Sequence, residues 1–174
     1  MIIWLNGAYG VGKTTIGKLL KDELRPSFIF DPEAVGNGIR DNYPEELFYE
    51  TFEQYDIWLK TCYEILKDIS SHYDGTIIVP MTLLFKKSYQ WIIRPLKEKG
   101  IDVRYIFLDA DYETLYKRMV ESGREEKDSW CVNHINDCLK QQKSDNNAIH
   151  INTVNRTPHE IVNDIKKLIK RPQI

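Results

Sequence analysis

Cysteine is scarce in this chain, and the few cysteines form no recognisable pattern. Of 174 residues only Cys62, Cys131 and Cys138 are cysteines, an odd number without a C-x-x-C pair. A disulfide framework needs an even set, and structural zinc sites use closely spaced cysteine or histidine pairs. We therefore expect reduced cysteines in a cytoplasmic protein, with neither disulfides nor a zinc centre.

A surplus of one charge and long hydrophobic runs are lacking too. The formal net charge is −2, whereas nucleic-acid-binding domains usually carry a basic surplus, so we expect no nucleic-acid partner. No run approaches the roughly 18 apolar residues of a membrane span. The start, MIIWLNGAYG, lacks the basic and long apolar regions of a signal peptide. Because 42% of the residues are hydrophobic, a core can form, and one domain over 1–174 is expected.

Apolar runs alternate with helical patterns along the chain. The runs lie at 2–5, 28–30, 76–79, 103–108 and 148–151. Most are β-branched or aromatic and show no clean alternation, which is typical of strands covered on both faces. The clearest helix start is the capping box from Thr157 to Glu160, and Pro95 is expected to kink a helix over 86–99. This order predicts an α/β fold with a parallel sheet flanked by helices.

A glycine-rich motif, GAYGVGKT, runs from Gly7 to Thr14. It fits the phosphate-binding pattern G-x-x-x-x-G-K-[ST], in which successive backbone N–H groups turn toward phosphate oxygens and the next helix offers its positive N-terminus. Lys13 is predicted to reach the β and γ phosphates of ATP, and the Thr14 hydroxyl to ligate Mg²⁺. The predicted nucleotide-binding residues are Gly7, Ala8, Tyr9, Gly10, Val11, Gly12, Lys13, Thr14 and Thr15.

Several classes of P-loop protein lack their signatures here. No N-K-x-D guanine-reading element follows the loop, and no L-S-G-G-Q-like sequence is present. The chain is also too short for a transporter motor or a helicase. What remains is the small-molecule kinase plan, with an acceptor-binding insert over about 32–72 and an arginine-bearing lid over about 119–135.

The chain resembles the tunicamycin-resistance protein family. The segments MIIWLNGAYGVGKTT, FDPEAVGNGIR, IIVPMTLL and KRM…KDSW…I..C carry this resemblance, in order over nearly the whole chain. The family is related to nucleotide, shikimate and chloramphenicol kinases. The resemblance implies a five-stranded parallel sheet in the order 2-3-1-4-5, ATP binding, and tunicamycin or another nucleoside-like compound as ligand. Family members carry a basic C-terminal extension that holds them to a membrane surface. This sequence stops at Ile174, and we expect no stable membrane attachment.

Candidate acceptor-binding residues follow the second and third strands. Asp31 could accept the proton of an acceptor hydroxyl or help to hold magnesium, or it could only cap the helix that starts at Pro32. Arg40 could clamp an anionic part of the acceptor or be a solvated surface arginine. The third strand ends in VPMT without the acidic Walker B residue. Thr82 in that stretch could contact the acceptor or a magnesium-bound water, or simply end the strand.

Three arginines are candidates for charge stabilisation and base binding. Arg118 and Arg124 flank Gly123, and a kinase needs cations over the transferring phosphoryl group, whose negative charge is spread over three oxygens. The alternative is a charged helix end, with Arg124 paired to a neighbouring glutamate. Arg156 follows the fifth strand and could stack on the nucleotide base. Aromatic residues over 43–63 could line an apolar acceptor pocket, although most are expected in the core.

These residues leave three functions open. The first is an ATP-dependent phosphotransferase that acts on a hydroxyl of an antibiotic, nucleoside or sugar. The second is a nucleotide-gated protein that binds and sequesters a drug without turnover, which the missing Walker B acid favours. The third is a nucleotide-dependent regulatory module with a protein partner. The protein is expected to be a monomer or a homodimer.

Overall fold

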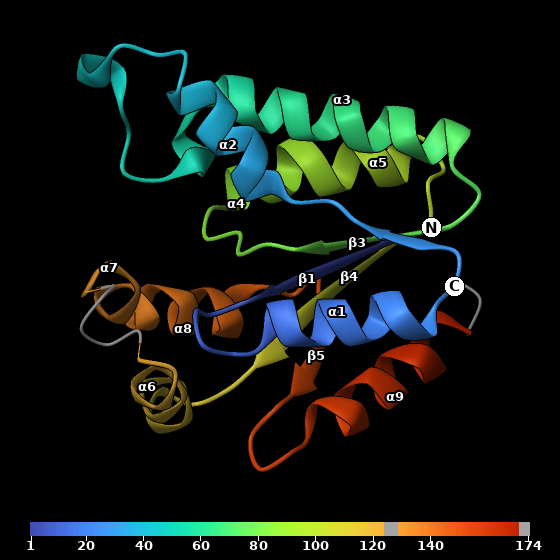
Figure 1. Cartoon of the computed structure of the whole chain (residues 1–174), viewed down its shortest axis with the longest axis vertical. Coiled ribbons are helices and arrows are strands. Elements are labelled where there is room, and N and C mark those ends of the chain that lie inside the picture. The colour runs from blue at the N-terminus through green and yellow to red at the C-terminus, as the bar shows by residue number, and fades with distance from the viewer. Residues whose placement is uncertain (124–128, 171–174) are drawn as a thin grey trace.

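The computed structural model describes residues 1–123 and 129–170, which form a sheet between two layers of helices (Figure 1). Five strands pair in parallel in the order β2-β3-β1-β4-β5. They are β1 (Ile2–Gly7), β2 (Ser27–Ile29), β3 (Thr76–Pro80), β4 (Val103–Asp109) and β5 (Ile149–Asn152). The five predicted strands and the predicted sheet order are confirmed.

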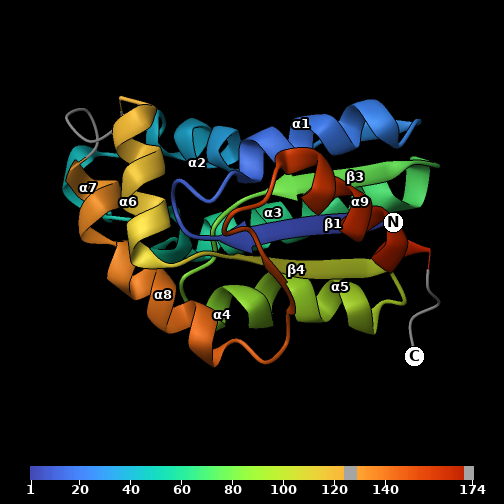
Figure 2. The same ribbon diagram turned by 90° about the horizontal axis from the view of Figure 1, so that it is seen from below.

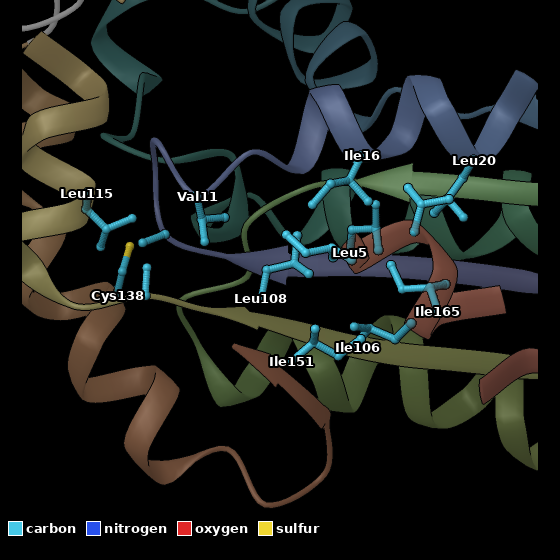
Figure 3. Packing of buried hydrophobic residues seen from close by; sticks show 14 of the residues in the cluster. Leu5, Val11, Ile16, Leu20, Ile106, Leu108, Leu115, Cys138, Ile151 and Ile165 are labelled. Atoms are coloured by element: carbon cyan, nitrogen blue, oxygen red, sulfur yellow. The ribbon is translucent and has the colours of Figure 1, made fainter. Parts of the chain in front are cut away.

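Each central strand divides its side chains between two hydrophobic clusters. In β1, Ile2 and Trp4 pack on one side and Ile3 and Leu5 on the other, because successive residues of a strand point to opposite faces. The first side is covered by α3 (Asp56–His72) and α5 (Arg94–Glu98), and the second by α1 (Lys13–Glu23) and α9 (Pro158–Ile169) (Figures 1 and 2). Figure 3 shows the second cluster, in which α1 and α9 meet the sheet. Burial on both faces explains why the runs of β1, β3 and β4 lack polar alternation. The same expectation is wrong for the edge strands β2 and β5, most of whose residues are not fully buried.

Local helix signals hold in the folded chain. The Thr157 side chain accepts from the Glu160 N–H while the Glu160 carboxylate accepts in return, so the predicted capping box of α9 is confirmed. The helical run around Pro95 consists of α4 (Lys86–Ser88), a π-helical turn η3 (Tyr89–Ile93) and then α5, which contains Pro95. Proline has no N–H for a regular helical bond, and a π turn absorbs that loss. The π turn ends just before α5, and the kink expected at Pro95 stays a prediction.

The remaining elements surround the carboxyl ends of the strands. They are α2 (Pro32–Arg40), η1 (Glu45–Leu47), η2 (Phe52–Gln54), α6 (Tyr112–Glu121), α7 (Ser129–Asn133) and α8 (Ile135–Ser144). We call residues 41–55, between α2 and α3, the strap. The aromatic surplus over 43–63 divides between core and surface: Tyr55 in the strap and Trp58 in α3 are buried, while Phe48 and Tyr49 in the strap are exposed. Within the described ranges, no helix is long and apolar enough to cross a membrane.

Gly36 allows helix α2 to pack closely on the strap. A Cβ at this position would lie 2.4 Å from a ring carbon of Phe52, whereas a Cβ at Gly38 would meet nothing within 4 Å. We expect Gly36→Ala to lower the free energy of unfolding by about 1–3 kcal/mol through overpacking. Gly38→Ala, on the same helix, should raise it by roughly 0.5–1 kcal/mol. Urea unfolding of both variants measures the difference, and equal effects would contradict the packing argument.

Candidate active site

The glycine-rich loop between β1 and α1 depends on its glycines. Gly7, Gly10 and Gly12 have φ angles of 137°, 80° and 104°, a region that L side chains rarely enter. A Cβ on Gly7 would lie 2.6 Å from the Leu108 carbonyl oxygen. Gly12 is the N-cap of α1, and within the described chain no side chain caps that end. The loop and the positive end of α1 therefore form a cradle that fits a chain of phosphates.

Lys13 folds back over this loop. Its Nζ donates to the carbonyl oxygens of Gly7, at 2.8 Å, and of Ala8, at 3.0 Å. The same Nζ lies 5.3 Å from the centre of the Tyr9 ring. These contacts hold the ammonium group at the mouth of the cradle, where it complements negative charge.

A main cavity of 710 Å³ opens beside the loop. It is lined by Tyr9, Gly10, Gly12, Lys13, Thr14, Thr15, Lys18, Ile29, Asp31, Glu33, Pro80, Thr82, Arg118, Ser122 and Cys131. Most residues predicted from the sequence thus face one space. Ala8 and Val11 differ, because their side chains are buried in the core and only their backbone remains for a ligand.

Asp31 caps α2 and also lines the main cavity, and its role toward an acceptor or magnesium stays a prediction. Its Oδ1 accepts from the Glu33 N–H at 2.9 Å and caps α2. The same residue lines the main cavity. The cap fixes the carboxylate at the end of β2, and it does so without removing the group from the cavity.

Thr82 supports the loop from the side of β3. Only 5% of its surface is exposed, and its hydroxyl donates to the Gly7 carbonyl oxygen at 2.9 Å. It lines the main cavity and also a side cavity of 330 Å³. The side cavity is bounded by Tyr9, Glu33, Arg40, Glu50, Thr51, Phe52, Glu53, Met81 and Thr82. Because Tyr9, Glu33 and Thr82 line both spaces, the two cavities adjoin.

Arg40 lies in the side cavity and holds the strap. Its Nη2 donates to the carbonyl oxygens of Tyr49, at 2.7 Å, and Glu50, at 3.3 Å. Its guanidinium lies 4.5 Å from the centre of the Phe52 ring. The half-buried guanidinium is thus engaged by backbone carbonyls and an aromatic face, and its contact with an anionic part of an acceptor stays a prediction.

Arg118 joins three parts of the site. Its guanidinium donates to the Thr153 hydroxyl and carbonyl oxygen, at 3.0 and 2.8 Å, and to the Val11 carbonyl oxygen at 3.4 Å. It thereby connects α6, the loop after β5 and the glycine-rich loop, and it lines the main cavity. Arg124, its predicted partner, lies outside the described residues.

Arg156 lies on the other side of the glycine-rich loop. It lines a cavity of 310 Å³ together with Gly10, Gly12 and Arg118. Its Nη2 pairs with an Asp164 carboxylate oxygen at 2.5 Å, which holds the guanidinium against α9. The predicted stacking on a nucleotide base remains a prediction for this cavity.

Two buried polar groups escaped the sequence analysis. Glu53 is only 4% exposed, although no motif or spacing in the sequence marks it. Burial raises the pKa of its carboxyl, and hydrogen bonds from Ser88, Leu84 and Phe85 counter that shift. Asn6 is fully buried and bonds Tyr105 at 2.7 Å. Its polarity within the apolar run IIWLNG is a signal that could have found it.

His150, in β5, makes a pH-dependent contact with Asp109 at the end of β4. One ring nitrogen faces the Asp109 carboxylate at 3.0 Å and the other the Asp145 carbonyl oxygen at 2.7 Å. Burial alone would lower the pKa of His150, but these two acceptors outweigh it and raise the pKa. Because the folded pKa exceeds the unfolded one, the stabilisation is complete below about pH 6.5 and is lost as the pH rises through the folded pKa.

We therefore expect His150→Gln to be most destabilising in mild acid. The side chain is 34% exposed, so the loss should not exceed about 1 kcal/mol. Urea unfolding of wild type and variant at about pH 5.5 and about pH 8.5 measures the difference. A difference that stays constant with pH would contradict this assignment.

Comparison with known proteins agrees with this geometry. The family model described as an AAA domain matches residues 3–150. A shikimate kinase of Clostridium botulinum strain Eklund 17B is 32% identical over 170 residues and covers 96% of each chain. A shikimate kinase of Enterococcus faecalis is 27% identical over 187 residues, or 97% of this chain and 98% of its own.

A solved structure gives the same result for the fold. The structure of the Deinococcus radiodurans tunicamycin resistance protein matches with a TM-score of 0.80 and 22% identity, covering 98% of this chain and 96% of that one. This likeness bears out the resemblance drawn from the sequence. With its phosphate cradle, sheet order and relatives, the chain belongs to the AAA-domain family of P-loop proteins, among the small-molecule kinase-like members.

Proposed function

We propose that this protein transfers the γ-phosphoryl group of ATP to a hydroxyl of a small molecule. One observation carries the proposal: a single 710 Å³ cavity brings together the glycine-rich loop, the Asp31 carboxylate and the Arg118 guanidinium. A phosphate cradle, a candidate base and a cation are the parts that phosphoryl transfer requires.

Each residue has a definite part in this scheme. The loop amides and Lys13 bind the β and γ phosphates. The Thr14 hydroxyl would hold Mg²⁺, which neutralises charge on the phosphates when bound. The acceptor oxygen forms a bond to the γ-phosphorus as the bond to the β–γ bridging oxygen breaks and ADP leaves. Asp31 takes the hydroxyl proton, and Arg118 neutralises the charge that develops on the transferring group.

The side cavity supplies room for the acceptor. It adjoins the main cavity through Tyr9, Glu33 and Thr82, so an acceptor held there has its hydroxyl near the phosphate chain. The insert over about 32–72 is proposed to bind the acceptor, and the segment over about 119–135 to close over it. Tunicamycin and shikimate are the first acceptors to test, because proteins named for them are similar to this chain.

The test is acceptor-dependent turnover. The purified protein is incubated with MgATP and each member of a panel that includes tunicamycin, shikimate, nucleosides and sugars. ADP is measured, and the acceptor is recovered for mass spectrometry. We expect ADP formation that depends on one acceptor and a mass gain of one phosphate on that compound. Lack of transfer to every member would count against a phosphotransferase.

The residues at the end of β3 favour a second function, in which the protein binds a drug without turnover. Pro80 and Thr82 stand there instead of an acidic residue, and a site without the acidic Walker B residue would suit capture of a drug without turnover. That function predicts tight binding of the drug that strengthens with MgATP, and recovery of the drug unmodified. Multiple turnovers would exclude it.

A further inference from the structure

Glu53 is a buried carboxylate whose oxygens meet several donors from one distant segment. Its Oε1 accepts from the Leu84 N–H at 2.8 Å, and its Oε2 accepts from the Phe85 N–H at 3.1 Å. The Ser88 hydroxyl donates to Oε2 as well. A charge with 4% exposure is costly unless such partners satisfy it. The strap therefore supplies a group that the segment from Leu84 to Ser88 needs.

That segment begins the helical run α4–η3–α5. Its N-cap, Phe85, has no side chain that can accept a hydrogen bond. The first N–H groups of a helix require acceptors, and a negative charge there also complements the helix dipole. Glu53 acts as this cap from 32 residues away in the sequence. The position of the loop over 81–85 thus depends on the strap.

The other side of the loop over 81–85 holds the phosphate cradle. Asn6 Oδ1 accepts from the Leu83 N–H and from the Gly7 N–H, each at 2.8 Å. The Thr82 hydroxyl donates to the Gly7 carbonyl oxygen, which also accepts from Lys13. Hydrogen bonds, joined by the backbone from Thr82 to Leu84, therefore connect Glu53 through this loop to Gly7 and Lys13.

We propose that Glu53 is a positioning residue that couples the strap to the glycine-rich loop through Thr82. Glu53 lines the side cavity, whereas Gly7 and Lys13 belong to the phosphate cradle. The position of the strap therefore influences the position of the cradle. Any effect of this coupling on catalysis rests on the proposed function. Its effect on nucleotide affinity does not require transfer to any acceptor.

The experiment is a double-mutant cycle on the dissociation constant of MgAMPPNP. It compares wild type, Glu53→Gln, Thr82→Val and the double variant. Glutamine cannot satisfy both N–H groups and the hydroxyl, so we expect Glu53→Gln to weaken binding about tenfold. In the Thr82→Val background the same change should have a smaller effect, because only the route through Asn6 then joins this loop to Gly7. Glu98→Gln, an exposed partner of Arg94, is the matched control and should bind as wild type does.

The dissociation constants of the variants support or overturn the coupling between Glu53 and the glycine-rich loop. Additive effects, or an unchanged affinity in Glu53→Gln, would overturn it even if the variant melts at a lower temperature. Should Glu53→Gln fail to fold, Ser88→Ala removes one donor and is judged by the same criterion, with a loss of about threefold expected. A wild-type protein that does not bind MgAMPPNP would overturn this coupling and the proposed function together. Binding and coupling without transfer to any acceptor would count only against the phosphotransferase.

Discussion

Replacing Lys13 with alanine is expected to lower the rate of phosphoryl transfer by about 10²–10³-fold. The Lys13 ammonium lies over the glycine-rich loop, where it donates to the Gly7 and Ala8 carbonyl oxygens. Without it, the main cavity loses the charge that complements the β and γ phosphates. ATP affinity should also fall by about tenfold or more, since hydrogen bonds to charged groups are the strong ones. Steady-state kinetics and calorimetry with MgATP measure the two losses.

A lysine on the same helix provides the control. Lys21 lies in the last turn of α1 and is exposed, so Lys21→Ala should change neither the rate nor the affinity. If Lys13→Ala bound MgATP as tightly as wild type, the phosphate chain would not lie in this loop, and the proposed function would fail.

Replacing Asp31 with asparagine is expected to lower kcat by about 10²–10⁴-fold while leaving stability nearly unchanged. The variant separates two roles of one carboxylate. Asparagine caps a helix about as well as aspartate, so the bond to the Glu33 N–H can remain. An amide cannot take the proton of an acceptor hydroxyl, so the chemical step should slow. Rapid-quench measurement of the transfer step and urea unfolding report on the two roles separately.

Asp111 is a matched control for this change. It caps α6 by accepting from the Thr114 N–H at 2.7 Å, in the same way that Asp31 caps α2, and it does not line the main cavity. Asp111→Asn should therefore leave kcat unchanged. A wild-type kcat in Asp31→Asn would reduce Asp31 to a helix cap and favour capture of a ligand without turnover.

Much of the architecture could be predicted because its signals are local. The central strands β1, β3 and β4 are recognisable as buried runs, since residues covered on both faces must be apolar. The edge strands β2 and β5 are recognisable only as short apolar runs, because most of their residues are not fully buried. The capping box at Thr157 and the cap at Asp31 involve residues two or three positions apart. The glycine-rich loop needs positive φ angles at fixed spacings, which only glycine provides without strain. The sheet order came from the resemblance to a family, and the structure confirms it.

The contacts that assemble the site could not be predicted in this way. Arg118 was identified as a candidate cation, but its partners Thr153 and Val11 are 35 and 107 residues away. Arg40 was placed near an acceptor, yet its hold on the Tyr49 carbonyl depends on how the strap folds back. Contacts of this kind depend on which strands become neighbours, and no local spacing reports that.

The sequence by itself determined the phosphate loop, the strands and helices, and the class of fold, because backbone propensity and burial act on neighbouring residues. Only the tertiary structure decided that Glu53 caps a helix 32 residues further along, that Thr82 supports Gly7, and that two cavities share a wall. A buried polar group has to find its partners wherever the packed elements bring them. For Glu53 and Thr82, the sheet order and the folding of the strap determine which partners are within hydrogen-bonding distance.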